Sequence, residues 1–250
     1  MESTRPTRLS DGHQLVDLPS GTRLECHVSL APASAYTSDE LDADADQGKL
    51  AVCLHPWAWL GGRMEDPVLQ MLMSPLHAQG YDVLRYNSRG VGQSTGRSSW
   101  TGKSEAQDLQ ELIQWAVMSM SSVRSLVLVG YSYGSLIVSL HPILPDTEIS
   151  HILLSYPLSP RHWLTAFHGR YYTNALNTLL SDPRAVVLVV YGDEDNFTSV
   201  EEYDLWADDL SRQADGRGKL EIVRIAEANH FWRGPDTTTR LVEAVEGWLS

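Results

Sequence analysis

The sequence predicts an α/β fold with a mostly parallel, doubly wound sheet, helices on both faces and an antiparallel hairpin at the N-terminus. From residue 50 onward, apolar runs typical of strands alternate with helical patterns, and this alternation is typical of parallel sheets. Before them, two alternating segments flank Pro19-Ser20-Gly21, which indicates a hairpin. The 250 residues suffice for one domain spanning 1–250.

The expected elements follow in order. The hairpin pairs 14–18 with 22–30, and further strands are expected at 50–54, 81–86, 125–129, 149–156, 185–191 and 220–225. Helices are expected at 66–79, 104–120, 135–141, 171–180, 199–211 and 236–249. Gly80 marks the end of the first helix, and Ser104 is the expected N-cap of the second.

The composition limits the class of protein and of partner. Hydrophobic residues make up 42% and charged residues 20% of the chain, as in ordinary globular proteins. The net charge of -13 argues against nucleic acid or an anionic membrane as a partner. No secretory signal is visible in 1–10, and the longest apolar run, 185–191, is too short to span a bilayer. We expect a cytoplasmic protein with a small-molecule substrate.

Two cysteines and one acidic segment carry weaker signals. Cys26 and Cys53 lie in apolar runs, so we expect buried thiols, with a disulfide as the alternative. Segment 31–48 holds five carboxylates among small residues, which indicates a solvated surface loop. An acidic metal loop is the alternative, but the spacing lacks the glycine and terminal glutamate of an EF-hand. We expect no metal and no organic cofactor.

The segment Gly130-Tyr131-Ser132-Tyr133-Gly134 lies between an expected buried strand and an expected helix. Gly-x-Ser-x-Gly in this context is typical of a nucleophile elbow, a sharp turn that exposes a reactive serine. The two glycines lack the Cβ atoms that would collide across the turn, and free N–H groups of the helix face the same place. Ser132 is therefore the candidate nucleophile. The alternative is an ordinary turn that contains a small polar residue.

A serine hydroxyl needs a base, usually histidine, and the histidine needs a carboxylate that holds its tautomer. In this topology the chain order is serine, acid, histidine. Three carboxylates follow strand 185–191; we choose Asp195, with Asp193 as the second choice and Glu194 as a solvated residue. His230 follows the last strand and is the candidate base, although a lone loop histidine is more often incidental.

A developing oxyanion needs two N–H donors, one of them on the residue after the nucleophile, Tyr133. The second is expected where strand 50–54 ends. Pro56 has no N–H, so Trp57 is the candidate. His55, beside it, is expected to brace this loop by hydrogen bonding rather than to act as a base.

These motifs together resemble the α/β-hydrolase superfamily over nearly the whole chain. Residues 54–62, LHPWAWLGG, are similar to the H-P-x-P-x-x-G-G stretch of small, nearly lidless hydrolases close to dienelactone hydrolases and prolyl-oligopeptidase-type domains. Residues 85–94, RYNSRGVGQS, are similar to their R-x-N-x-R-G-V-G-x-S loop, in which we expect Arg89 to tie loops together. The resemblance implies an α/β-hydrolase fold with a minimal cap. Ala58 departs from it, since a second proline is usual there.

Aromatic side chains flank the candidate catalytic positions. They predict a substrate pocket for an apolar or aromatic molecule, with simple core packing as the alternative. The expected pocket residues are Trp59, Tyr131, Phe197, Phe231 and Trp232. Segment 157–172 is a possible short cap, and so short a segment argues against a lipase with a large mobile lid.

The sequence therefore predicts a serine hydrolase with the triad Ser132, His230 and Asp195, acting on an ester, thioester or related acyl bond. One alternative keeps the pocket for lyase, cyclase or carbon–carbon bond chemistry. The other is a ligand-binding member of the fold without catalysis, which has no need for all three side chains. Fold alone does not decide between them.

Overall fold

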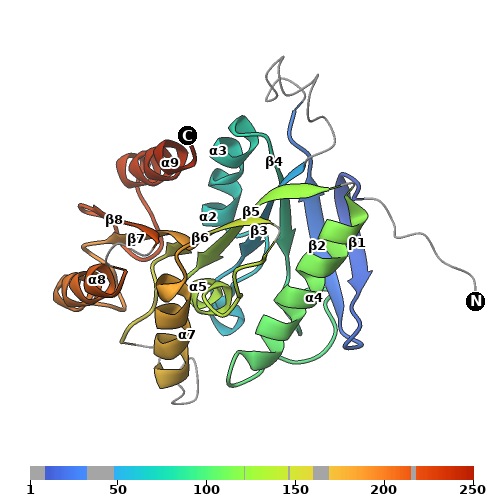
Figure 1. Ribbon diagram of the computed structural model, residues 1–250, viewed down its shortest axis with the longest axis horizontal. Helices are drawn as coiled ribbons and strands as arrows, with labels where there is room; N and C mark the ends of the chain where they lie inside the picture. The colour runs from blue at the N-terminus through green and yellow to red at the C-terminus, as the bar shows by residue number, and fades with distance from the viewer. Residues whose placement is uncertain (1–8, 33–47, 121, 146, 160–168, 215–217) are drawn as a thin grey trace, which may run out of the picture.

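The computed structural model describes residues 9–32, 48–120, 122–145, 147–159, 169–214 and 218–250. Within them, eight strands form a sheet in the order β1-β2-β4-β3-β5-β6-β7-β8 (Figure 1). The pairs β1·β2 and β2·β4 are antiparallel, and every other neighbouring pair is parallel. The predicted fold, a mostly parallel sheet with an antiparallel N-terminal hairpin, is confirmed.

The strands run as β1 Gly12–Asp17, β2 Arg23–Ser29, β3 Gly48–Leu54, β4 Tyr81–Tyr86, β5 Val123–Tyr131, β6 Glu148–Leu154, β7 Val186–Gly192 and β8 Lys219–Ile225. The helices are α2 Pro67–Met71, α3 Met73–Ala78, α4 Lys103–Ser119, α5 Tyr133–Val138, α7 Gly169–Ser181, α8 Val200–Gln213 and α9 Pro235–Leu249, with a short 3-10 turn η2 Ala58–Leu60. Most boundaries lie within two residues of the expected ones.

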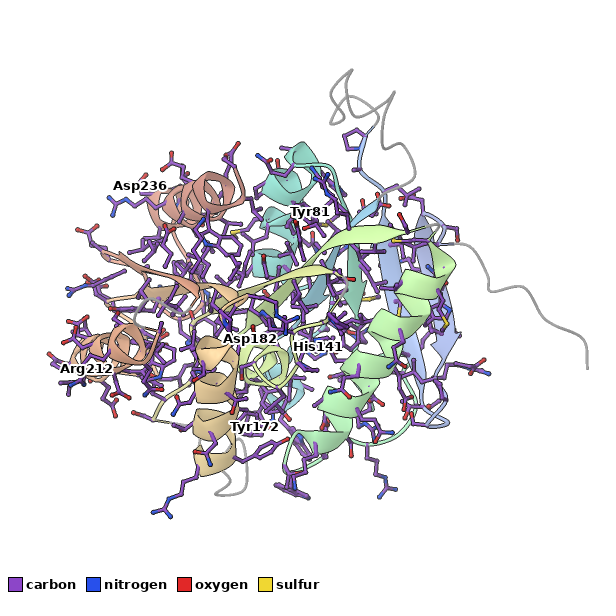
Figure 2. All side chains as sticks on the ribbon, in the orientation of Figure 1. Tyr81, His141, Tyr172, Asp182, Arg212 and Asp236 are labelled. Carbon is purple, nitrogen blue, oxygen red and sulfur yellow. The ribbon has the colours of Figure 1, made fainter. Side chains whose placement is uncertain are left out.

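Helices cover both faces of the sheet: α2, α3 and α9 one face, α4, α5, α7 and α8 the other (Figure 1). Strand β5 shows why its sequence is apolar throughout. Leu126 and Leu128 pack in the layer under α4 and α5, whereas Val127 and Val129 pack in the layer under α2 and α9, because successive side chains of a strand alternate between faces. Figure 2 shows the side chains that fill both layers.

The helix expected at 66–79 is two helices that meet at Leu72. Pro75 explains the break, because a proline has no N–H to donate to the carbonyl four residues earlier, and its ring crowds that carbonyl. Asp66 is the N-cap of α2, with its Oδ1 accepting from the Val68 N–H at 2.9 Å.

Helix α4 begins at Lys103, so the prediction of Ser104 as its N-cap was wrong. The N-cap is Gly102, with φ 70° and no side-chain cap bond. A Cβ on Gly102 would collide with the Tyr172 hydroxyl. Tertiary packing against α7, rather than a local cap, therefore sets where this helix begins.

Cys26 and Cys53 are buried free thiols, as expected. Burial raises the pKa of Cys53 to about 12. Most of the acidic segment 31–48 and of the possible cap 157–172 lies outside the described residues. Within the described part of the chain, no cluster of three or more His, Cys, Asp or Glu side chains suits a metal ion. No helix there is long and apolar enough to cross a membrane.

Helix α8 offers a test of local stability, because it begins with a complete capping box. The Ser199 hydroxyl accepts from the Glu202 N–H, and the Glu202 carboxylate accepts from the Ser199 N–H. Ser199→Ala should therefore lower the free energy of unfolding by about 1 kcal/mol, as measured by urea denaturation. Ser211→Ala, on the exposed face of the same helix, is the control and should change it little. Equal effects of the two substitutions would contradict the capping role.

Candidate active site

The turn from β5 into α5 holds Ser132 in a conformation that few residues adopt. Its φ is 53° and its ψ is -116°, and such backbone strain persists only where the surroundings enforce it. A Cβ on Gly130 would lie 2.5 Å from the carbonyl oxygen of Gly134. The first glycine of the motif is therefore required by the turn itself, as expected.

The second glycine has a different role from the one expected. A Cβ on Gly134 would lie 2.5 Å from the Leu54 carbonyl oxygen and 2.8 Å from that of His55. Gly134 therefore lets the start of α5 approach the end of β3, which is the strand beside β5 in the sheet. The order of strands reverses between these two strands, and doubly wound sheets bind ligands at such a switch point.

Three side chains from distant parts of the chain form a continuous hydrogen-bonded row. The Ser132 Oγ lies 3.0 Å from Nε2 of His230, and Nδ1 of His230 lies 2.6 Å from Oδ2 of Asp195. With the proton on Nδ1, the imidazole donates to the carboxylate and accepts from the hydroxyl. The Asp195 side chain is fully buried and that of His230 is 5% exposed, so bulk water does not compete for either bond.

The choice between Asp195 and Asp193 follows from their partners. Asp195 accepts from the N–H groups of Phe197 and Thr198 as well as from His230. Asp193 instead accepts from the Glu227 N–H at 2.7 Å and lies 3.2 Å from the Arg224 guanidinium. Asp193 therefore fastens the loop that carries His230 and does not contact the imidazole.

The loop of His230 is held from two further sides. The Tyr131 hydroxyl donates to the His230 carbonyl at 2.7 Å, and the Trp232 indole N–H donates to the Ser155 hydroxyl at 3.1 Å. The Phe197 ring meets the imidazole edge to face, with ring centroids 4.6 Å apart. These contacts restrict the imidazole to the orientation that reaches Ser132.

His55 is held as a structural, neutral imidazole. Burial lowers its pKa to about 4, so one ring nitrogen carries a proton and the other accepts. Nδ1 donates to the Pro56 carbonyl at 2.6 Å, which leaves Nε2 to accept from the Ser88 N–H and hydroxyl. Its only acceptor site is thus occupied. The prediction that His55 braces this loop is confirmed.

The loop after β4 is fastened to the loop after β3. The Asn87 amide accepts from the Met64 N–H and donates to buried Glu25, and Arg89 forms a two-point ion pair with Asp108. Burial alone would raise the pKa of Glu25, but hydrogen bonds from Gln93 and Asn87 together hold it below its usual value. Arg89 also donates to the Thr22 hydroxyl in the β1–β2 turn at 3.2 Å. It therefore ties the loop after β4 to that turn and to helix α4, as expected.

The candidate oxyanion donors, Trp57 and Tyr133, belong to the two segments that meet at Ser132. Within the described residues, the N–H groups of Trp57 and Tyr133 donate to no protein acceptor. Trp57 lines one cavity with Ser132 and His230, and Tyr133 opens the helix directly after Ser132. Their role toward an oxyanion stays a prediction.

A cavity of about 370 Å³ contains Ser132 and His230. Of the expected pocket residues, Tyr131, Phe197 and Phe231 line it. The other two do not. Trp59 is 72% exposed and faces a neighbouring cavity, and Trp232 is 2% exposed within the core layer of α9. The η2 turn carries Trp59 outward, and the bond to Ser155 holds Trp232 inward.

The lining residues that were not predicted are Pro56, Leu60, Gly61, Gly62, Asp66 and Arg233. Asp66 is half-buried, and burial raises the pKa of its carboxyl group. In the sequence, Asp66 stood out only as the first residue of the helix expected at 66–79, and this position does not indicate a pocket. Arg233 lies over the Phe231 ring, 4.9 Å from its centroid.

A family model described as alpha/beta hydrolase fold matches residues 60–167. The uncharacterized protein RP471 of Rickettsia prowazekii is 27% identical over 76% of this chain and 75% of its own. The fold is similar to XC6422 of Xanthomonas campestris, an α/β serine hydrolase without a lid, with TM-score 0.72, 22% identity and coverage of 97% and 95%. It is also similar to Est1E of Butyrivibrio proteoclasticus, solved with ferulic acid bound, with TM-score 0.68, 18% identity and coverage of 94% and 96%.

The buried, neutral His55 predicts acid sensitivity. Its pKa is depressed in the folded state, so the unfolded chain binds the extra proton, and stability falls as the pH drops from about 6.5 to about 4. This residue alone should contribute up to about 3 kcal/mol to that fall. Urea denaturation of wild type and of His55→Gln at several pH values measures it. The variant should show a shallower dependence, and an unchanged dependence would contradict the assignment.

Proposed function

We propose that this chain, which belongs to the α/β-hydrolase superfamily, is a serine hydrolase that cleaves an ester or thioester of a small molecule. One observation carries the proposal: the unbroken row of hydrogen bonds from the Ser132 hydroxyl through His230 to the buried Asp195. A ligand-binding protein would gain nothing from aligning a hydroxyl, an imidazole and a desolvated carboxylate in this order.

In the proposed reaction, His230 removes the hydroxyl proton while the Ser132 Oγ attacks the carbonyl carbon. The imidazolium that forms is stabilised by Asp195, whose second oxygen is held by two backbone N–H groups. His230 then returns the proton to the departing alcohol or thiol, and the acyl group stays on Ser132. Water repeats these steps, with His230 as its base, and releases the carboxylic acid and the free serine.

The negative charge on the carbonyl oxygen requires donors that are already in place. The N–H groups of Trp57 and Tyr133, which have no acceptor among the described residues, are suited to this task, because both belong to segments with fixed positions. Trp57 follows the braced residues His55 and Pro56, and Tyr133 follows the strained turn. Little reorganisation is then needed when the charge develops.

The cavity supports a small, apolar or aromatic group next to the reacting bond. Phe197 and Phe231 flank the imidazole of His230, with ring centroids 4.6 and 5.6 Å away. A volume of about 370 Å³ is within the size of ordinary small-molecule sites. The binding of ferulic acid, an aromatic molecule, by the fold neighbour Est1E is consistent with this class.

Ser132→Ala should lower kcat for p-nitrophenyl butyrate by roughly 10⁴-fold or more, because no other group can accept the acyl chain. The measurement follows p-nitrophenolate release with each variant, and circular dichroism checks its fold. Activity that survives Ser132→Ala but fails in His230→Ala would contradict acyl transfer and favour acid–base chemistry in the same pocket.

The two neighbouring aspartates allow a matched comparison. Asp195→Asn should lower kcat by about 10⁴-fold, because the amide favours the wrong tautomer of the imidazole. Asp193→Asn leaves the imidazole contact intact and should lower kcat by less than about tenfold, through weaker fastening of the loop. Equal losses in the two variants, or the larger loss in Asp193→Asn, would contradict the assignment of Asp195.

A further inference from the structure

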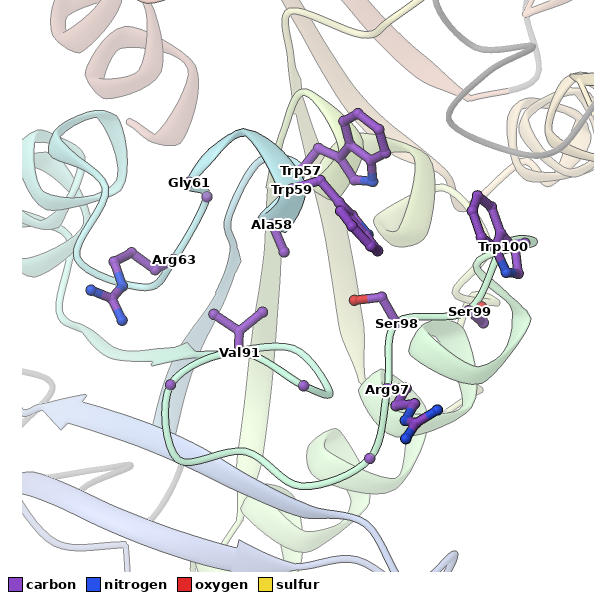
Figure 3. A pocket seen from close by; sticks show the side chains of 14 residues that line it. Trp57, Ala58, Trp59, Gly61, Arg63, Val91, Arg97, Ser98, Ser99 and Trp100 are labelled. Carbon is purple, nitrogen blue, oxygen red and sulfur yellow. The ribbon is translucent and has the colours of Figure 1, made fainter.

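A second, larger cavity adjoins the one that contains Ser132. It has a volume of about 750 Å³ and lies between residues 57–63 and residues 90–100 (Figure 3). The two cavities share Trp57, Gly61 and Gly62 as a common wall. The loop that carries the candidate oxyanion donor thus separates them, and a substrate with its carbonyl at Ser132 can extend past this loop.

The charge of the second cavity is opposite to that of the chain. Although the chain carries a net charge of -13, the described residues that line this cavity include Arg63 and Arg97 and no aspartate or glutamate. Figure 3 shows these two arginines on opposite sides of the cavity. A site with this sign of charge favours an anionic ligand, because arginine binds carboxylate and phosphate groups through paired N–H donors.

Both arginines are available to a ligand. Within the described residues Arg97 forms no ion pair, and the backbone N–H groups of Arg97 and Ser98 have no acceptor. Arg63 lies 3.5 Å from Glu65, but both side chains are about half exposed, and such surface pairs contribute little. The carboxylate of Glu105, behind Ser99, is buried and already accepts two bonds from that serine.

The remaining lining suits a short apolar chain. Ala58, Trp59 and Val91 face the space between the two loops in Figure 3. Trp59 is 72% exposed, which is unusual for so large an apolar side chain. Methylene groups leading from the reacting carbonyl to an anionic end would cover this surface.

The proposed mechanism indicates whether the acyl group or the leaving group of the substrate lies in the second cavity. His230 must reach the departing oxygen or sulfur, so the leaving group lies against Phe197 and Phe231, which flank the imidazole. The acyl group then lies on the opposite side, toward Trp57 and the second cavity. We propose, on the basis of the function proposed above, that the natural substrates are esters or thioesters whose acyl chain ends in an anionic group, which the positive charge of Arg63 and Arg97 attracts into the second cavity.

A matched pair of esters tests this with one leaving group. Wild type should hydrolyse the mono-p-nitrophenyl ester of adipic acid with a kcat/KM about tenfold above that of its methyl-capped, neutral analogue. The ratio of kcat/KM for the anionic ester to kcat/KM for the neutral ester should fall toward one in the double variant Arg63→Gln/Arg97→Gln. The ratio should be retained in Arg97→Lys and should decrease at high ionic strength, which screens charges. Arg124→Gln, an exposed arginine at the start of β5, is the control and should retain the preference.

Equal kcat/KM for the two esters, or a preference that survives loss of both arginines, would overturn the proposal. A comparison of 4-acetoxybenzoate with its methyl ester tests an anionic charge on the leaving group instead. A preference for the charged compound in this pair alone would also overturn the proposal. The proposed hydrolase function and the proposed anion site can be tested separately by measuring how tightly the Ser132→Ala variant binds the adipate ester, with tryptophan fluorescence as the signal. If no ester is hydrolysed, the proposed function fails, while tighter binding of the anionic ester would still support the anion site.

Discussion

The close packing of the β5–α5 turn against the end of β3 is the constraint on which the rest of this site depends. Gly134 lies so near the Leu54 and His55 carbonyls that no Cβ fits between them. This contact places the Ser132 turn beside the loop that carries Trp57. Ser132 and Trp57, which follow separate strands, thereby line one cavity, and neither residue can move away without disturbing the contact between β5, α5 and β3.

The surrounding hydrogen bonds give similar side chains different tasks. Asp195 is buried against His230, while Asp193, two residues earlier, pairs with Arg224 on β8. His55 is neutral with its one acceptor site filled, whereas His230 directs its acceptor nitrogen at a hydroxyl. Burial and neighbouring groups, rather than residue type, therefore decide which carboxylate and which imidazole can take part in chemistry.

Features that depend on local sequence could be predicted, and those that depend on contacts between loops could not. The strands and the elbow follow from periodicity and turn chemistry, and Asp195 and His230 were chosen from the chain order of serine, acid and histidine that is known for this topology. The division of the expected helix 66–79 at Leu72 also has a local cause, Pro75. We did not predict it, because the apolar residues keep a helical spacing across the proline. By contrast, the outward position of Trp59 and the second cavity depend on how two separate loops pack, which no spacing along the chain records.

The central claim is that this packing makes one hydroxyl in the chain nucleophilic. Incubation of the folded protein with a fluorophosphonate, followed by peptide mapping with mass spectrometry, tests it most directly. The account predicts a single stoichiometric adduct on the peptide that contains Ser132, and none after urea denaturation. An unmodified protein, or an adduct on another residue, would contradict it.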